Sequence, residues 1–230
     1  MIKAVFWMAI MSLALVAPFV NAQTYQPDIR EFTVGDDLAF EGHSSFSLHG
    51  QGTVEFWVAA GWHNDPGYDP VLIYHADSQG VLFALSMLGD RSGLSLQTDN
   101  QIDELSVSFA DDQLHHVALV NLGDSVGLMV DGRVVGAFQV SLNKGDSREF
   151  RLGSAPGPST EFVGALGGLR IWDITLDQEV LIVYALDDPL NNTQPHPDLE
   201  SMKAYSNLTM DTIEFTDAPD SEPTEVATNQ

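Results

Sequence analysis

Apolar residues alternate with polar ones, or gather in short apolar runs, from about residue 36 to residue 172. Glycine and aspartate separate these runs at fairly regular intervals. Short strands spaced in this way, with turn residues between them, are typical of an all-β sandwich. The pattern predicts an all-β fold of two antiparallel sheets. The predicted strands are residues 37–40, 44–48, 53–59, 71–75, 81–87, 94–97, 105–109, 115–121, 126–130, 133–139, 149–152 and 162–172.

One turn can be predicted from two residues. Asp131 and Gly132 lie between the apolar runs 126–130 and 133–139. Asp-Gly in this position is a strong hairpin pattern, because both turn residues must adopt a positive φ angle. We therefore expect a tight turn between these two strands.

A single segment of the central region has a helical pattern. Thr175 and Gln178 have the spacing of a capping box, and acidic residues nearby suit the positive end of a helix dipole. The pattern predicts one short helix over residues 176–186 that closes an edge or an end of the sandwich. Its expected apolar face consists of Leu176, Val180, Val183 and Tyr184.

The N-terminus has the composition of a targeting segment. Lys3 precedes an apolar run over residues 4–20, and Val-Asn-Ala precedes Gln23. This arrangement is typical of a signal peptide, which would span residues 1–22. A membrane anchor is the alternative, but the run does not clearly reach the roughly 20 apolar residues that a spanning helix needs. After cleavage we expect no membrane insertion.

The remaining segments outside the core region are less regular. Residues 23–34 form a short N-terminal segment, and residues 187–216 form a C-terminal extension with several prolines. Within the extension, residues 198–205 allow a turn or two of helix. Residues 217–230 are acidic and lack aromatic side chains, so we expect a disordered tail.

Charge and cysteine content narrow the class of protein. The 230 residues contain 9 Lys and Arg against 33 Asp and Glu, a formal net charge of −24, and no cysteine. Such a surface repels phosphate groups, which disfavours nucleic acid and anionic lipid as partners. An exported protein without disulfides fits a secreted or periplasmic bacterial protein better than a small animal module. The negative charge indicates a cation-rich ligand or a dependence on calcium. Ordinary acidic solvation of an exported protein is the alternative explanation.

Four runs of sequence carry a resemblance to a known family. They are Thr-Val-Glu-Phe-Trp-Val at 53–58, the paired apolar runs with a polar loop at 71–85, the His-His run with its Val-Asp-Gly turn at 115–132, and residues 162–173 before the predicted helix. Together they resemble laminin G-like and concanavalin A-like jelly-roll domains, which include the pentraxins. The resemblance covers about residues 35–186 and implies a jelly-roll sandwich with one short C-terminal helix.

The resemblance does not extend to the family's calcium sites. Calcium-binding laminin G modules have an aspartate directly before the strand that begins here at Val81, but this chain has Gly80 there and Asp77 three residues earlier. The acidic run of pentraxins has no counterpart in residues 153–161. Calcium is therefore not implied by the family pattern.

Calcium needs six to eight oxygen ligands. The acidic loops of this chain nevertheless offer such oxygens. If a calcium ion binds, we expect Asp77 to be its first ligand. The alternative is that these loops are ordinary turns, since aspartate, asparagine and glycine favour turns in any case. The candidate binding residues on the predicted rim loops are Trp62, Asp65, Tyr68, Asp69, Asp77, Asp99 and Asn100.

Aromatic residues near these loops suggest a carbohydrate platform. Aromatic faces stack on the apolar faces of sugars, while neighbouring carboxylates and amides bind the hydroxyl groups. Trp62 and Tyr68 are the loop candidates, whereas Tyr74 is in an apolar run and is expected in the core. Packing within the loops is the alternative for all three. His115 and His116 are adjacent on a strand, point to opposite faces and do not suit a shared metal.

The sequence predicts a secreted, non-enzymatic binding module that recognises a glycan or an extracellular protein through its rim loops. A glycoside-cleaving enzyme on a concanavalin-like fold is one alternative. Such enzymes need two closely placed carboxylates, and no paired motif of this kind occurs. A structural role in assembly at the cell surface, through the helix or the acidic tail, is the other alternative.

Overall fold

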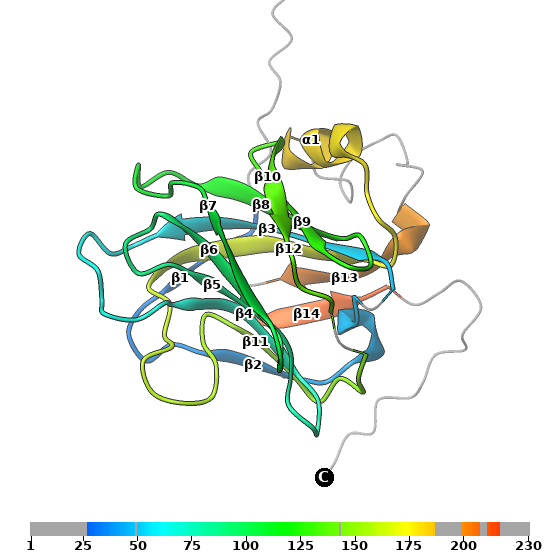
Figure 1. Cartoon of the computed structure of the whole chain (residues 1–230), viewed down its shortest axis with the longest axis horizontal. Helices are drawn as coiled ribbons and strands as arrows, with labels where there is room; N and C mark the ends of the chain where they lie inside the picture. The colour runs from blue at the N-terminus through cyan, green and yellow to red at the C-terminus, as the bar shows by residue number, and fades with distance from the viewer. Residues whose placement is uncertain (1–26, 49, 143, 187–198, 208–210, 217–230) are drawn as a thin grey trace, which may run out of the picture.

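The computed structural model describes residues 27–48, 50–142, 144–186, 199–207 and 211–216. Two antiparallel sheets pack face to face, and one helix lies over the outer side of one of them (Figure 1). The strands of the larger sheet are β1 (Ile29–Phe32), β3 (Gly52–Ala60), β8 (His115–Asn121), β9 (Val126–Val130), β10 (Arg133–Phe138), β12 (Gly164–Trp172), β13 (Met202–Asn207) and β14 (Thr212–Phe215). Those of the smaller sheet are β2 (Leu38–Glu41), β4 (Val71–Ala76), β5 (Val81–Met87), β6 (Gly93–Gln97), β7 (Ile102–Ser106) and β11 (Glu149–Leu152).

The eight-stranded sheet has the order β10-β9-β8-β3-β12-β13-β14. Strand β1 joins this sheet beside β12, and its residues pair with Gly164 to Gly167. Strand β13 pairs with the other half of β12, opposite Arg170 to Trp172. The N-terminal segment and the C-terminal extension thus share one edge of β12, while β3 occupies the other edge.

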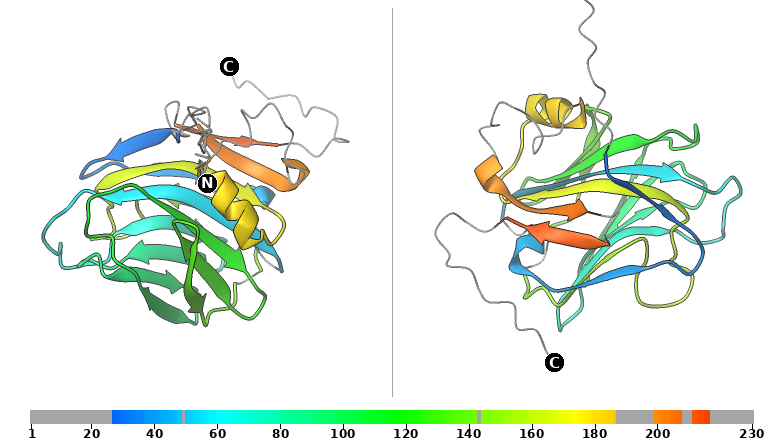
Figure 2. Two further views of the ribbon diagram at one scale, coloured as in Figure 1. Left: turned by 90° about the horizontal axis from the view of Figure 1, so that it is seen from above. Right: turned by 180° about the vertical axis from the view of Figure 1, so that it is seen from behind.

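The six-stranded sheet has the order β2-β11-β4-β5-β6-β7. Seen from above, it forms the outermost layer, and no drawn helix or strand lies beneath it (Figure 2, left). Phe83 and Phe150 of this sheet contribute to the aromatic core between the two sheets. Phe46, Phe83 and Phe150 are almost completely buried, and each such side chain contributes about 1.5–3 kcal/mol through burial. Phe46 and Phe150 stack with ring centroids 4.2 Å apart.

The outer face of the eight-stranded sheet has a second, smaller core beneath helix α1 (Gln178–Leu186). Trp172 and Tyr184 stack there with ring centroids 4.9 Å apart. Leu181 and Met202 are buried in the same cluster. Because this cluster attaches α1 to the sheet, the helix covers part of one face and closes neither sheet edge.

A buried polar group lies beside this second core. Glu55 is fully buried, and its Oε1 accepts hydrogen bonds from Trp172 Nε1 at 2.9 Å and lies 3.0 Å from Arg170 Nε. Its Oε2 lies 2.9 Å from His116 Nε2. Burial raises the pKa of Glu55, but Arg170, His116 and Trp172 together outweigh it and lower the pKa. The carboxylate is therefore charged inside the protein, where paired groups stabilise it.

The structure confirms the all-β sandwich and most of the predicted strands. Residues 81–87, 115–121, 126–130 and 149–152 form strands with the expected bounds. The turn at Asp131 and Gly132 is also confirmed, with φ angles of 50° and 72°. His115 and His116 point to different environments, as predicted.

Two strand predictions were wrong. Residues 44–48 contain a 3-10 turn, η1 (Ser44–Phe46), because His43 Nδ1 accepts a hydrogen bond from Ser45 N at 3.2 Å and starts a turn. The predicted strand at 105–109 begins earlier, as β7, and ends at Ser106. The expected helical turns at 198–205 are limited to η2 (Leu199–Ser201), and β13 follows directly.

The helix exists, but its predicted start and face were partly wrong. Thr175 Oγ1 donates to Asn121 O at 3.1 Å, and Gln178 Nε2 donates to Gly132 O at 2.9 Å. No capping box forms because both side chains contact the sheet instead. Leu181, rather than Val183, is buried with Tyr184. The proposed signal peptide and acidic tail lie outside the described residues.

Candidate functional site

The residues predicted for one binding site lie at two opposite ends of the six-stranded sheet. The loop of residues 61–70 precedes β4, while the turn that contains Asp77 follows the same strand. Six residues of extended chain separate the two ends by about 20 Å. Asp99 and Asn100, in the turn between β6 and β7, belong to the Asp77 end. The candidate residues therefore form two groups and not one site.

At the first end, the aromatic candidates hold neighbouring loops together. Trp62 Nε1 donates to Gly89 O at 2.7 Å, and its ring packs edge-on against Phe162. Tyr68 OH donates to Glu161 O at 3.1 Å. Both side chains are partly buried, so each uses its polar atom within the protein. Their contacts favour loop packing over an open aromatic platform.

The carboxylates at this end have similar local contacts. Asp69 Oδ1 accepts a hydrogen bond from Gly89 N at 2.9 Å, and Asp65 Oδ1 accepts one from Gly67 N at 2.8 Å. Each uses one oxygen on the backbone and remains solvent-exposed. Asp65 and Asp69 thus shape the loop.

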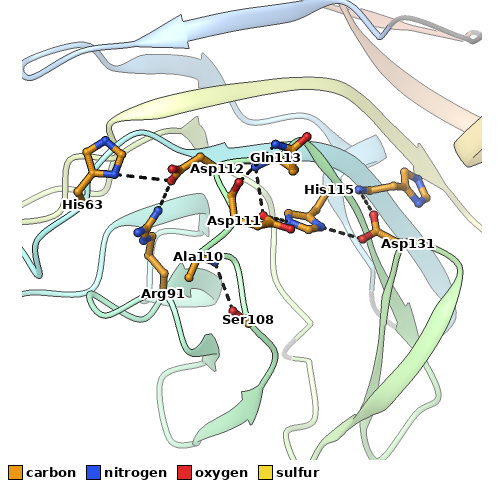
Figure 3. A network of polar contacts seen from close by, with 10 residues as sticks. His63, Arg91, Ser108, Ala110, Asp111, Asp112, Gln113, His115 and Asp131 are labelled. Carbon is orange, nitrogen blue, oxygen red and sulfur yellow. Dashed lines mark hydrogen bonds and ion pairs between the residues drawn. The ribbon is translucent and has the colours of Figure 1, made fainter.

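A polar network continues from this end across the loop that connects β7 with β8 (Figure 3). Asp112 Oδ1 lies 2.5 Å from Arg91 Nη1 and 3.7 Å from His63 Nδ1. This carboxylate links the turn after β5, the loop before β4 and the loop before β8. The contacts order the three loops relative to one another, and sequence spacing gave no indication of them.

His115 forms the second part of the same network. Its Nε2 lies 2.9 Å from Asp111 Oδ1 and its Nδ1 lies 2.7 Å from Asp131 Oδ2. Desolvation lowers the pKa of His115, but the two carboxylates together outweigh it and raise the pKa. A protonated imidazole can donate to both carboxylates, whereas a neutral one can donate to only one. The network fastens the loop before β8 to the hairpin turn at Asp131.

At the second end, Asp77 and Asp99 build turns. Asp77 Oδ1 accepts hydrogen bonds from Gln79 N at 2.6 Å and Gly80 N at 2.9 Å. Asp99 Oδ1 accepts one from Val81 N at 2.7 Å. Asn100 beside it is exposed. Asp99 also lies so close to Gly80 that a Cβ there would be 2.4 Å from its Oδ1, so the two turns contact each other.

The described residues do not assemble a calcium site around Asp77. No group of three or more histidine, aspartate or glutamate side chains within the described ranges is placed to hold a metal ion. One oxygen of Asp77 is already occupied by two backbone amides. Calcium binding stays a prediction, which melting temperatures with and without millimolar calcium will test, and we derive no step from it.

The outer face of the six-stranded sheet carries a row of side chains that sequence reasoning missed. Strand register places Ala39, Arg151, Tyr74, Ala84 and Gln97 side by side across five strands. Directly paired residues of antiparallel strands share a face. We call this row the outer-sheet surface. Arg151 and Tyr74 lie between the small side chains of Ala39 and Ala84, and the amide of Gln97 follows Ala84.

Tyr74 is the central residue of this surface and is half-buried. Its expected place in the core was wrong, because Ile73 and His75 face inward instead. A register shift between Val71 and Ile73 sets which residues face the core. Burial raises the pKa of Tyr74, and Glu149 raises it further. The phenol therefore stays neutral and can donate a hydrogen bond at neutral pH.

Arg151 connects Tyr74 to a pocket at the sheet edge. Its Nε donates to Glu149 Oε1 at 2.7 Å, and its Nη1 donates to Asp37 Oδ2 at 2.5 Å. The pocket has a volume of about 250 Å³. We call it the edge pocket. Its polar lining includes Asp36, Asp37, Arg151, Ser154, Thr160 and Glu161.

These features define a two-sheet antiparallel β-sandwich of the jelly-roll kind, with an open sheet face and a polar pocket beside it. A family model described as the Concanavalin A-like lectin/glucanases superfamily matches residues 32–181. The match covers most of the chain, so the protein belongs to this family. No curated protein matches the chain. Among the described residues, no helix is both long and apolar enough to cross a membrane.

Solved structures with the same fold are distant in sequence. A heptameric SAP-like pentraxin from Limulus polyphemus has a TM-score of 0.57 and 17% identity over 74% of this chain and 86% of that chain. A Trypanosoma rangeli sialidase in complex with the inhibitor DANA has a TM-score of 0.54 and 15% identity; the match covers 70% of this chain and 28% of that chain. The binding domain of botulinum neurotoxin serotype G has a TM-score of 0.53 and 10% identity; the match covers 68% of this chain and 41% of that chain. At these identities the likeness concerns the fold alone.

Proposed function

We propose that this protein is a secreted, non-enzymatic module that binds a glycan on the outer-sheet surface. One observation carries the proposal. Tyr74 lies half-buried between Arg151 and Ala84, in the row that ends at Gln97. No described helix or strand covers this face of the sheet (Figure 2, left). An aromatic ring with hydrogen-bonding neighbours suits a sugar ring, whose faces are apolar and whose edges carry hydroxyl groups.

The edge pocket supports the same function because it adjoins this surface through Arg151. Its carboxylates and hydroxyl groups accept and donate hydrogen bonds, as the hydroxyl groups of a sugar require. At about 250 Å³ it is smaller than most drug-sized ligand pockets, which span roughly 300–1,000 Å³. It therefore suits one terminal sugar unit, while neighbouring units lie over Tyr74.

The charge of the site selects among glycans. Asp36, Asp37, Glu149 and Glu161 surround a single Arg151, which is already paired with Asp37 and Glu149. Like charges placed together are unfavourable. The surface consequently favours neutral or amino-bearing sugars over sulfated or uronic acid polymers.

Carboxyl pKa values give no support to an acid catalyst. Among the described residues, the carboxyl groups whose pKa departs from its ordinary value are Asp36, Glu55, Asp90 and Asp111, and at each the pKa is lowered. A glycosidase needs one carboxylic acid with a raised pKa to protonate the leaving group. These four groups are unsuited to that step, which favours binding over cleavage.

The proposal is tested by titrating the mature protein with defined polysaccharides in a calorimeter. Laminarin and dextran serve as neutral probes, chitosan oligosaccharides as the amino-bearing probe and alginate as the anionic probe. We expect binding to at least one neutral or amino-bearing probe, with no binding to alginate. No binding to any of the four, or a preference for alginate, would contradict the proposal.

A pair of tyrosine variants locates the site. Tyr74→Ala removes the ring from the outer-sheet surface, whereas Tyr205→Ala removes a similarly half-buried ring from β13 of the other sheet. We expect Tyr74→Ala to weaken binding about tenfold, equivalent to about 1.4 kcal/mol, and Tyr205→Ala to have little effect. Equal loss of binding in the two variants would contradict the placement of the site on the outer-sheet surface.

A further inference from the structure

A second cavity lies on the opposite side of the protein, between helix α1 and the outer face of the eight-stranded sheet. It has a volume of about 190 Å³. We call it the helix pocket. Its lining consists of Trp57, His116, Asp131, Gly132, Ile182, Ala185 and Leu186. It shares no residue with the edge pocket or the outer-sheet surface, so it is independent of the proposed glycan site.

Most of the lining of the helix pocket is apolar. The half-buried ring of Trp57 lies on the sheet side, and Ile182, Ala185 and Leu186 lie on the helix side. A cavity of about 150 Å³ lined by apolar side chains holds a benzene molecule. A pocket of this size and chemistry therefore suits a phenyl ring or a branched aliphatic side chain.

Two side chains of the lining are polar, His116 and Asp131. His116 is buried and paired with Glu55. Asp131 lies at the pocket with its side chain 49% exposed; its Oδ1 accepts a hydrogen bond from His116 N at 3.0 Å, and its Oδ2 lies 2.7 Å from His115 Nδ1. His115 also contacts Asp111, so even a protonated His115 leaves the two carboxylates with a net negative charge that attracts a cation. The pocket thus combines an apolar anchor position with a negative rim.

The exposed surface of helix α1 beside the pocket has the same combination of apolar and acidic side chains. Together with the pocket it is larger than the area that a small molecule would cover. Ile182 and Leu186 are 38% and 68% exposed. Glu179 is exposed three residues before Ile182, a spacing that places both on one side of a helix. The helix carries no lysine or arginine. Exposed apolar side chains with acidic neighbours are typical of a protein interaction surface.

We propose that the helix pocket is the docking site for a segment of a partner protein that inserts one aromatic or branched apolar side chain and carries lysine or arginine residues beside it. The cavity holds the apolar side chain against Trp57, Ile182 and Ala185. The carboxylates of Asp131 and Glu179 bind the basic residues. An anionic membrane surface is disfavoured as the occupant, because it would face a chain with a net charge of −24.

The test uses synthetic peptides and methyl NMR spectra of the mature protein. The probe is acetyl-Lys-Lys-Phe-Lys-Lys-amide, and the controls replace phenylalanine by glycine or all four lysines by glutamate. We expect the phenylalanine–lysine peptide alone to shift the methyl resonances of Ile182, Ala185 and Leu186 at up to millimolar concentration. Added salt should weaken this binding, because part of the attraction is between exposed charges.

Two tryptophan substitutions separate pocket binding from general attraction to the helix. Ala185→Trp fills the helix pocket, whereas Val183→Trp adds the same ring to the same helix outside the pocket lining. We expect Ala185→Trp to weaken binding of the probe peptide at least tenfold and Val183→Trp to leave it unchanged. If Ala185→Trp lowers the melting temperature strongly, Ile182→Gln makes the pocket wall polar at an already exposed position and should weaken binding as well.

Three outcomes would overturn the proposal. The first is an absence of methyl shifts with the probe peptide at millimolar concentration. The second is equal shifts with the glycine control, which would show that charge alone attracts the peptide. The third is equal binding by the Ala185→Trp and Val183→Trp proteins. None of these results bears on polysaccharide binding at Tyr74, which is measured separately.

Discussion

His75 makes the stability of this protein depend on pH. The imidazole lies in the aromatic core between the sheets, with ring centroids of Phe83, Phe150 and Phe46 at 5.4, 5.9 and 6.2 Å. Among the described residues its Nε2 has no hydrogen-bond partner. Burial lowers the pKa of His75 to about 4, and the negative charge of Asp77 only partly opposes this effect. The folded protein therefore holds a neutral imidazole at neutral pH.

The size of the effect follows from the difference between the folded and unfolded pKa values. An unfolded histidine has a pKa of about 6.5, and the folded value is about 4. Because the folded pKa is the lower one, the unfolded chain binds the proton first as the pH falls. Stability is complete above pH 6.5 and decreases between pH 6.5 and 4. One pKa unit corresponds to about 1.4 kcal/mol, so the full loss is about 3 kcal/mol, of which about 2 kcal/mol occurs by pH 5.

The measurement compares urea denaturation of the wild-type protein and His75→Leu at pH 7.5 and pH 5. We expect the wild-type protein to lose about 2 kcal/mol more than the variant between these two pH values. His115, whose pKa is raised, has the opposite sign and stabilises the fold at low pH, but it is present in both proteins and cancels in the difference. His75→Phe provides a second apolar replacement in case leucine packs poorly.

An equal loss of stability in the wild type and both variants would refute this reasoning. It would mean that the imidazole is protonated inside the core or reaches water at pH 5. NMR titration of the His75 ring checks this directly, because a buried neutral ring shows little change in chemical shift between pH 7.5 and 5, whereas a ring that becomes protonated shows a clear one.

Three further predictions concern other parts of the fold. Glu55→Gln should lower the free energy of unfolding by about 3–5 kcal/mol in urea denaturation, because Arg170 keeps a buried charge without its carboxylate; a loss below about 1 kcal/mol would contradict this. Gly164→Ala should lower the melting temperature more than Gly67→Ala, since a Cβ at Gly164 would lie 2.2 Å from Ala59 O whereas Gly67 has open space. Asp111→Asn should lower the pKa of His115 in an NMR titration, because one of its two carboxylate partners is lost; an unchanged pKa would show that Asp131 alone sets it.

Local sequence patterns predicted the strands that alternate clearly and the Asp131-Gly132 turn, because each depends on neighbouring residues alone. They failed at β1 and β13. Strand β1 is only four residues long, and the inward positions of β13 include the small residues Ala204 and Ser206. Neither strand has the strong apolar pattern that identifies a strand in a single sequence. Both strands form because they pair with β12, a contact between distant residues that a local sequence pattern does not show.

The candidate site was less predictable than the fold. The candidate aspartates lie in loops, but which loops share an end depends on strand order, which sequence spacing does not give. Tyr74 was expected in the core because its run Val-Leu-Ile-Tyr-His-Ala looks apolar throughout. Only the register of β4 against β5 and β11 shows that His75 faces inward and Tyr74 outward.

The shared edge of β12 has a consequence for how the chain is made. Residues 29–32 and 202–205 pair with neighbouring halves of this strand, although about 170 positions separate them in the sequence. A nascent polypeptide that has emerged only as far as Leu186 leaves the backbone groups of Arg170 to Trp172 open along that edge, and open strand edges promote aggregation. Truncation after Leu186 should therefore yield inclusion bodies rather than a smaller soluble protein, and the native sheet is completed only after translation reaches the last strands.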